Sequence, residues 1–172
     1  SSARNAGMKV ATGEYILFCD SDDYVHPQWC EFLLSAIEDH KNSFIVCGYK
    51  KTSNDCVDSQ MYQLSYKKTE YFKIFKRGIS GSVCNKIYNS KTIKENDISF
   101  DENCKFAEDV PFNSIYLKYC DSCCFIDYDL YYYYENHDSI MNTYYTNWLG
   151  YHLNTFYLRL PYIEAEHILE YC

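Results

Sequence analysis

An acidic segment that directly follows a short apolar segment constrains the fold of this chain most. Residues 15–19 read Tyr-Ile-Leu-Phe-Cys, and residues 20–23 read Asp-Ser-Asp-Asp. A short, continuous apolar run is typical of a strand buried in a parallel sheet. In an open α/β sheet, ligands bind beyond the carboxyl ends of the strands. The acidic segment is therefore predicted to lie at a ligand-binding edge of such a sheet.

The carboxylates of Asp20, Asp22 and Asp23 repel one another unless a cation neutralises them. Oxygen ligands suit Mg²⁺, Mn²⁺ or Ca²⁺, and Mg²⁺ commonly binds one or two carboxylates together with substrate phosphates. The segment thus predicts a divalent metal that bridges the protein and a diphosphate. The residues alone also fit a solvated acidic turn in front of a helix.

Alternating strand and helix patterns along the chain predict an α/β fold. We expect helices over residues 3–11, 27–37 and 69–77, one or two helical turns after Ser90, and a further helix that begins at residues 108–111. We expect strands over residues 15–19, 44–47, 83–88, 125–126 and 130–134. Residues 51–68 lack a clear period and are expected to form a loop or a ragged hairpin.

Composition excludes several classes of function. The chain has 172 residues, 47% of them hydrophobic, so a sizeable core can form, and its net charge of −8 without a Lys/Arg block argues against nucleic-acid binding. No apolar run reaches the ~20 residues of a membrane span. The 10 cysteines lack the spacing of a metal site, and several lie within apolar runs, so we expect reduced, cytosolic thiols.

Three neighbouring segments near the start of the chain resemble the central signature of family-2 glycosyltransferases. They are residues 2–7, Ser-Ala-Arg-Asn-Ala-Gly; residues 11–16, Ala-Thr-Gly-Glu-Tyr-Ile; and residues 18–23, Phe-Cys-Asp-Ser-Asp-Asp. Members of that family have the GT-A fold, an α/β architecture with a mixed central sheet flanked by helices, and they use nucleotide sugars. The resemblance implies the same fold and a nucleotide-sugar donor here.

The resemblance also implies roles for single residues of these segments. It implies that Asp20 and Asp22 hold the metal, Mn²⁺ or Mg²⁺, with Asp20 toward the ribose or sugar end of the donor and Asp22 toward the diphosphate. Asp23 is an additional acid of the binding site, typical of this variant of the motif. Arg4 is expected near the phosphates or the donor sugar, although the residues alone also fit a surface or capping arginine.

A later segment, residues 106–112, reads Phe-Ala-Glu-Asp-Val-Pro-Phe and resembles the Glu-Asp motif of the same family. The resemblance implies that Asp109 is the catalytic base, with Glu108 beside it. An inverting transfer needs a carboxylate that takes the proton of the acceptor hydroxyl. The local sequence alone fits another role for Asp109 equally, that of a helix N-cap.

Two further segments give weaker resemblances. Residues 84–88, Cys-Asn-Lys-Ile-Tyr, resemble an aromatic-x-Lys-Leu-Tyr segment with cysteine in place of tryptophan, which implies a phosphate or acceptor contact for Lys86. A surface lysine is the alternative. Residues 130–140 resemble the late tyrosine-rich strand and its loop, which implies a phosphate or metal contact for His137. A solvated histidine is the alternative there, and the tyrosines are expected to pack a sheet.

The resemblance spans residues 1–143, which we expect to form a partial GT-A domain followed by a helical extension over residues 144–172. The first strand–helix–strand unit of the family is not recognisable, so we expect a fragment of a longer protein. The expected activity is inverting transfer of a sugar, from a UDP-sugar to a glycan or lipid-linked acceptor, in cell-surface polysaccharide synthesis. The expected location is the cytoplasm, or peripherally the inner face of the membrane. The alternatives are a non-catalytic metal- or glycan-binding module and an inert truncated transferase.

The acidic segment generates a prediction about metal dependence. In the complete protein that contains this chain, Asp22→Asn should abolish most of the activity without changing the folding, because a neutral amide is a weak ligand for Mn²⁺ or Mg²⁺. Release of nucleoside diphosphate, measured with and without each metal, checks this. Full activity in the presence of a chelator would contradict the metal role.

Overall fold

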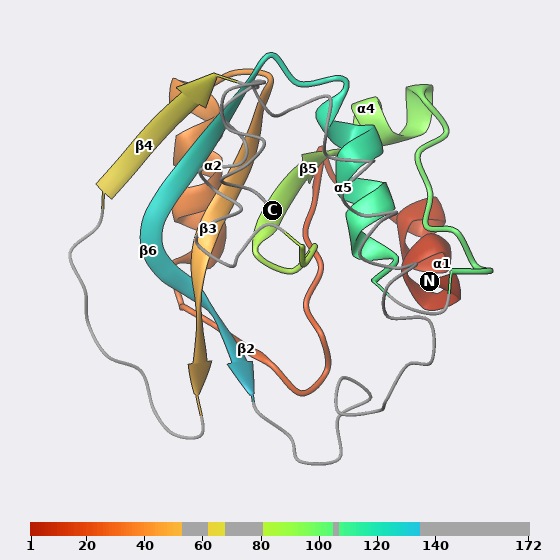
Figure 1. Ribbon diagram of the computed structural model, residues 1–172, viewed down its shortest axis with the longest axis horizontal. Coiled ribbons are helices and arrows are strands. Elements are labelled where there is room, and N and C mark those ends of the chain that lie inside the picture. The colour runs from red at the N-terminus through yellow and green to blue at the C-terminus, as the bar shows by residue number, and fades with distance from the viewer. Residues whose placement is uncertain (53–61, 68–80, 105–106, 135–172) are drawn as a thin grey trace, which may run out of the picture.

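A mixed β-sheet forms the centre of the protein (Figure 1). The computed structural model describes residues 1–52, 62–67, 81–104 and 107–134. Its strands are β1 (Tyr15–Ile16), β2 (Tyr24–Val25), β3 (Ser43–Thr52), β4 (Tyr62–Lys67), β5 (Lys86–Asn89) and β6 (Ser122–Tyr134). Its helices are α1 (Ser2–Val10), α2 (Trp29–Asp39), α4 (Ser90–Glu95) and α5 (Asp109–Leu117). The sheet order is β1-β5-β3-β6-β2, and β4 also pairs with β6.

The parallel pair of β3 and β6 lies at the middle of the sheet, and β5 runs antiparallel on the other side of β3. The segment Phe44–Cys47 of β3 is at most 1% exposed. A continuous apolar strand is expected where both faces of a sheet are covered. One helical face of α2 packs against this pair, and its buried residues are Trp29, Leu33 and Ala36.

A β-bulge interrupts the pairing of β3 with β6 at Gly48. Cys47 pairs with Ile126, Gly48 with Asp129 and Tyr49 with Tyr131, so β6 carries three extra residues across this irregularity. A Cβ atom on Gly48 would lie 2.7 Å from Asp129 Oδ1 and 2.8 Å from the Tyr128 carbonyl oxygen, so a larger residue would not fit. The bulge sets the register of the last part of β6, which carries the tyrosines.

The structure corrects the strand predicted over residues 15–19. Only Tyr15 and Ile16 join the sheet, and they pair antiparallel with β5, whereas the sequence predicted a parallel strand. An apolar run indicates burial, but it does not specify the direction of the neighbouring strand. In this segment Phe18 is buried by aromatic side chains rather than by strand pairing.

An aromatic cluster formed by Phe18, Tyr88, Phe100 and Phe112 fixes the chain just before Asp20. The Phe18 ring meets the other three edge-on, with centroids 5.5–5.9 Å apart. The Phe100 and Phe112 rings stack with centroids 4.1 Å apart. Such pairs contribute roughly 0.5–1.5 kcal/mol each beyond the burial of their area. The cluster therefore ties the acidic segment to β5 and α5.

Several other expected elements differ from the structure in their bounds. The helix expected over residues 3–11 is confirmed as α1, and the two strands expected over residues 125–134 form one continuous strand, β6. Part of the segment over residues 51–68, expected as a loop or a ragged hairpin, is strand β4, which pairs antiparallel with the start of β6. The sequence of β4, Tyr-Gln-Leu-Ser-Tyr-Lys, does alternate apolar and polar residues, but this short run was missed because it lies within a largely polar segment. The helix predicted over residues 69–77 lies outside the described residues.

The sequence predicts a helix after Ser90, whereas α4 begins at Ser90 itself and its cap is the preceding residue. The Asn89 Oδ1 atom accepts a hydrogen bond from the Thr92 backbone N–H at 3.0 Å. Pro27 precedes α2 instead of lying in its first turn, and Gln28 occupies the N-cap position. Helix starts are thus predicted to within two residues, which is the usual precision of such signals.

Two expectations from composition can be compared with the described residues. No helix in the described part of the chain is long and apolar enough to cross a membrane. The eight cysteines within it are free of disulfides, as expected for reduced thiols. The predicted helical extension over residues 144–172 lies outside the part of the chain that the structure describes.

Candidate active site

Arg4 brings the two acidic motifs of the sequence together. Its Nη2 atom lies 2.8 Å from Asp20 Oδ1, at the end of the apolar segment. Its Nη1 atom lies 2.7 Å from Asp109 Oδ1 and 3.1 Å from Glu108 Oε1, at the start of α5. Figure 1 shows why this is possible, since α1 lies beside the beginning of α5. Asp20 and Asp109, which are far apart in the sequence, therefore share one guanidinium.

The guanidinium of Arg4 is neither a surface charge nor a helix cap. Its side chain is 21% exposed, and Cζ lies 5.5 Å from the centre of the Phe100 ring. Burial acts to lower the pKa of Arg4, but Asp109 and Asp20 outweigh it and hold that pKa above its ordinary value. Arg4 therefore remains a cation, and it neutralises carboxylates that would otherwise repel one another.

Asp109 is the first residue of α5, but it does not cap the helix. Its Oδ1 atom binds Arg4, and its Oδ2 atom accepts a hydrogen bond from the Val83 backbone N–H at 3.0 Å. Glu108 occupies the N-cap position without a side-chain capping bond. The N-cap role that the sequence allowed for Asp109 is therefore wrong, and both of its oxygens are held by residues outside α5.

The residue before Glu108 has a strained backbone. Ala107 has a φ of 49°, in the left-handed region that favours glycine. Such a conformation costs an L-residue on the order of 1–2 kcal/mol. The strain sets the direction in which the chain enters α5, and so the direction in which Glu108 and Asp109 meet Arg4.

The environment of Asp109 raises the pKa of its carboxyl to about 6, with burial as the main cause. Glu108 acts in the same direction, because a neighbouring negative charge disfavours ionisation. Arg4, the Val83 N–H and Lys86 act in the opposite direction. A carboxyl with a pKa near 6 is largely ionised at neutral pH and is a stronger base than an ordinary aspartate.

A clamp formed by β6 holds the acidic turn, residues 20–23. The Tyr131 hydroxyl accepts a hydrogen bond from the Asp20 N–H at 3.1 Å and donates one to Asp23 Oδ2. The Tyr134 N–H donates to Asp23 Oδ1 at 2.9 Å. Burial is the main cause of the raised pKa of Asp23. Both oxygens of Asp23 thus face the protein, whereas the Asp22 side chain is exposed.

The arrangement of Asp20 and Asp22 fits a metal that is shared with a ligand. Asp20 has a 44% exposed side chain with one oxygen on Arg4, and Asp22 is exposed. Among the described residues, no group of three or more His, Cys, Asp or Glu side chains could hold a metal. One or two carboxylates combined with phosphate oxygens are a common donor set for Mg²⁺. The metal role of Asp20 and Asp22 stays a prediction.

The other two predicted binding residues have different outcomes. Lys86 has no exposed surface, so the alternative of a surface lysine is wrong. Its Nζ atom donates to the Ser82 carbonyl oxygen and lies 2.8 Å from Asn85 Oδ1. Its contact with a phosphate or an acceptor stays a prediction. His137 lies outside the described residues.

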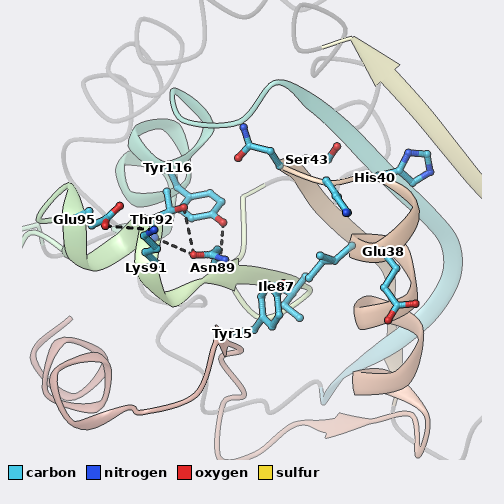
Figure 2. A pocket seen from close by; sticks show the side chains of 13 residues that line it. Tyr15, Glu38, His40, Ser43, Ile87, Asn89, Lys91, Thr92, Glu95 and Tyr116 are labelled. Carbon is cyan, nitrogen blue, oxygen red and sulfur yellow. Dashed lines mark hydrogen bonds and ion pairs between the residues drawn. The ribbon is translucent and has the colours of Figure 1, made fainter.

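A pocket of about 510 Å³ lies away from the carboxylates that contact Arg4, between α2, β5 and α4 (Figure 2). None of the predicted site residues lines it. Its polar contacts are structural, since the Tyr116 hydroxyl accepts from the Asn89 N–H at 2.8 Å and Asn89 caps α4. The predicted catalytic carboxylates therefore gather around Arg4 and not in this pocket.

Sequence reasoning did not identify Tyr131 and Val83 as parts of the site. The tyrosine row was expected to pack a sheet, and Tyr131 is indeed only 3% exposed, but its hydroxyl also holds the acidic turn. A buried tyrosine hydroxyl usually finds a partner, and this could have raised the question of which one. Val83 acts through its backbone N–H, which a side-chain pattern does not reveal.

The chain is similar in sequence and in fold to known glycosyltransferases. The profile of the family described as Glycosyl transferase family 2 matches residues 1–96, which include the acidic turn and Lys86 but end before Glu108. The chain is 32% identical over 165 residues to the uncharacterized glycosyltransferase EpsJ of Bacillus subtilis, a match that covers 91% of this chain and 48% of EpsJ. The chain thus spans about half the length of that curated relative.

A second relative is the poly(ribitol-phosphate) beta-N-acetylglucosaminyltransferase TarS of Staphylococcus aureus. It is 32% identical over 106 residues, which cover 62% of this chain and 18% of TarS. The crystal structure of TarS 1–349 in complex with UDP-GlcNAc is similar, with a TM-score of 0.68 and 24% identity, over 92% of this chain and 44% of that chain. This likeness concerns the fold, and it confirms the expected mixed α/β architecture of the GT-A type.

The raised pKa of Asp109 generates a prediction about stability. The folded protein keeps the Asp109 proton up to about pH 6, whereas the unfolded chain loses it near 3.8. The contribution of Asp109 to wild-type stability should therefore fall as the pH rises through this range. Asparagine can still accept from the Val83 N–H and does not titrate. The unfolding free energy of Asp109→Asn, relative to that of the wild type, should thus rise between pH 4 and pH 7. The rise should be on the order of 2–3 kcal/mol.

Urea unfolding of both proteins at several pH values measures this difference. The other carboxyl groups titrate in both proteins, so their contributions cancel to first order. A difference in unfolding free energy that stays constant from pH 4 to 8 would contradict the raised pKa of Asp109.

Proposed function

The chain belongs to glycosyl transferase family 2, and on this basis we propose that the complete protein transfers a sugar from a UDP-sugar to a glycan or lipid-linked acceptor, with inversion at the anomeric carbon. The carboxylates around Arg4 form the reaction centre. Family membership supports the transfer of a sugar, and the UDP-GlcNAc named in the TarS complex supports a nucleotide-sugar donor. The choice of donor and acceptor is part of the proposal.

The observation that carries this proposal is the shared guanidinium of Arg4. The guanidinium binds Asp20, on the donor side, and Asp109 at the same time. A donor and a general base must lie close together for a single displacement, because the acceptor oxygen has to reach the anomeric carbon while it loses its proton. This arrangement supports a catalytic role more than a non-catalytic binding module, which would need no such base.

In the proposed step, Asp109 takes the proton of the acceptor hydroxyl. The oxygen forms a bond to the anomeric carbon from the face opposite the nucleotide. The bond between that carbon and the phosphate oxygen breaks, and UDP leaves with the electron pair. One displacement inverts the configuration. Because the pKa of Asp109 is about 6, its ionised form is available at neutral pH, and the rate should decline at lower pH.

The acidic turn would bind the donor. Asp22, which is exposed, and Asp20 would hold Mn²⁺ or Mg²⁺, which when bound offsets the charge that builds on the leaving diphosphate. Asp23 instead fixes the turn through Tyr131. Arg4 keeps Asp20 and Asp109 in place, and it remains positively charged close to the donor.

The names of the relatives support a cell-surface polymer as the acceptor. TarS is named for transfer of N-acetylglucosamine to poly(ribitol phosphate), and another relative is named the minor teichoic acid biosynthesis protein GgaB of Bacillus subtilis. We propose the same class of acceptor and a reaction in the cytoplasm, where UDP-sugars are made, or at the inner face of the membrane.

The test is UDP release by the complete protein and by its Asp109→Asn variant. UDP-N-acetylglucosamine, UDP-glucose and UDP-galactose are offered in turn with Mn²⁺, with poly(ribitol phosphate) or water as the acceptor. Asparagine keeps the contact with the Val83 N–H but cannot take a proton, so UDP release should fall by roughly 10²–10⁴-fold. The matched control is Asp39→Asn, an exposed aspartate at the end of α2, which should retain wild-type activity.

Two outcomes would contradict the proposal. A folded Asp109→Asn variant with wild-type turnover would show that Asp109 is not the base. An active enzyme whose glycosidic product retains the configuration of the donor, as read by NMR, would contradict the single displacement.

A further inference from the structure

A fully buried lysine lies behind the Asp109 site. Lys86 is the first residue of β5 and has 0% exposure. Its ammonium group donates to the Ser82 carbonyl oxygen and to Asn85 Oδ1, and lies 5.8 Å from the centre of the Phe44 ring. A lysine without exposed surface is rare, because removal of an ammonium group from water is costly unless protein groups replace the water.

The lysine is part of a network that fixes one turn, residues 81–85. Asn113 of α5 donates to the Gly81 carbonyl oxygen at 2.8 Å and to the Ser82 carbonyl oxygen at 3.3 Å. The Asn85 side chain donates to the Cys47 carbonyl oxygen of β3 at 2.8 Å. The turn is therefore tied to β3 and α5 by side-chain amides, and to β5 by the charge of Lys86.

This turn delivers a hydrogen-bond donor to Asp109. The Val83 N–H, in the middle of residues 81–85, donates to Asp109 Oδ2 at 3.0 Å, and Arg4 binds Oδ1 at 2.7 Å. The carboxylate is thus held from two sides by two separate elements. A change in the position of the Ser82 carbonyl would move the adjacent Val83 amide, and so the oxygen that it holds.

The charge of Lys86 also reaches Asp109. The groups that face this carboxylate are Arg4 of α1, Glu108 at the N-cap of α5, Lys86 of β5 and the thiol of Cys84. Burial raises the pKa of that thiol to about 12, so it stays neutral. Burial is the main influence on the pKa of Asp109 and raises it, whereas Arg4 and Lys86 both lower it. Loss of the Lys86 charge should therefore raise this pKa further.

We propose that Lys86 is a positioning residue for Asp109: it anchors the turn of residues 81–85, whose Val83 amide orients the carboxylate, and it places a second positive charge behind that carboxylate. The inference rests on the proposed function, in which Asp109 is the general base. It gives Lys86 a role that needs no contact with the donor or the acceptor.

The test is Lys86→Gln in the complete protein. Glutamine removes the charge and can still donate to the Ser82 carbonyl oxygen. With the UDP-sugar that the wild type uses, we expect kcat to fall about tenfold to a hundredfold, as for a small misplacement of a catalytic group, with little change in the KM for the donor. The acid side of the pH–rate profile should move to higher pH, because the pKa of Asp109 rises when Lys86 no longer opposes its protonation.

The matched control is Lys91→Gln. Lys91 lies on α4, its side chain is 77% exposed, and it pairs with Glu95. The substitution therefore removes the same charge, but from the surface. It should leave kcat and the pH–rate profile unchanged. A folded Lys86→Gln variant with wild-type kcat and an unshifted profile would overturn the inference, and so would equal effects of Lys86→Gln and Lys91→Gln.

A second variant covers the case in which Lys86→Gln does not fold. Asn113→Ala removes the other side-chain donor to the turn without a change of charge. It should lower kcat at an unchanged donor KM, without the pH shift that loss of the lysine produces. Wild-type kcat in a folded Asn113→Ala variant would show that the turn does not position Asp109.

An activity-independent measurement separates this inference from the proposed function. NMR titration of ¹³C-labelled aspartate carboxyls, with Asp109→Asn to assign the signal, gives the pKa of Asp109 in the wild type and in Lys86→Gln. If no UDP-sugar is used, the proposed function fails, but a higher pKa in Lys86→Gln still supports the link between Lys86 and Asp109. An unchanged pKa would overturn that link, whether or not the enzyme is active.

Discussion

The contact of Arg4 with Asp20, Glu108 and Asp109 is the interaction on which the site depends. Carboxylates from two distant parts of the chain come within reach of one group only because that group is a cation. Without it, the partly buried Asp109 and Glu108 would face Asp20 with no compensating charge, and burial of unpaired charge is costly. The fold serves this contact, since the aromatic cluster beneath Arg4 fixes both α5 and the segment before Asp20.

Around this contact, each acidic motif has its own support. The Tyr131 hydroxyl holds the acidic turn by hydrogen bonds to the Asp20 N–H and to the Asp23 carboxylate. The Asp22 side chain between them is exposed to solvent. Asp109 is held by the Val83 amide on the side opposite Arg4, and that amide belongs to a turn anchored by the buried Lys86. Rigid support of this kind is what a general base and a donor-binding carboxylate need if they are to act on the same sugar.

Local patterns in the sequence predicted the features that depend on neighbouring residues in the chain. The helical stripe of α2, the buried run of β3 and the start of α5 within residues 108–111 follow from residue type and spacing. The acidic turn and the Glu-Asp pair were found as separate motifs, but residue spacing does not say that Arg4 joins them. The antiparallel pairing of β1 and the burial of Lys86 were also beyond reach, because both are decided by neighbours that are distant in sequence. Val83 contributes only its backbone, and a backbone donor has no sequence signal.

The coupling between Arg4 and Asp109 tests the central claim most directly. A double-mutant cycle of Arg4→Gln and Asp109→Asn, followed by urea unfolding at pH 8 where Asp109 is ionised, isolates the free energy of interaction between the two side chains. If the guanidinium holds the carboxylate as the distance of 2.7 Å indicates, the coupling should be at least about 1 kcal/mol. A coupling near zero would mean that the two motifs reach their places independently of Arg4, and it would contradict the account of the site.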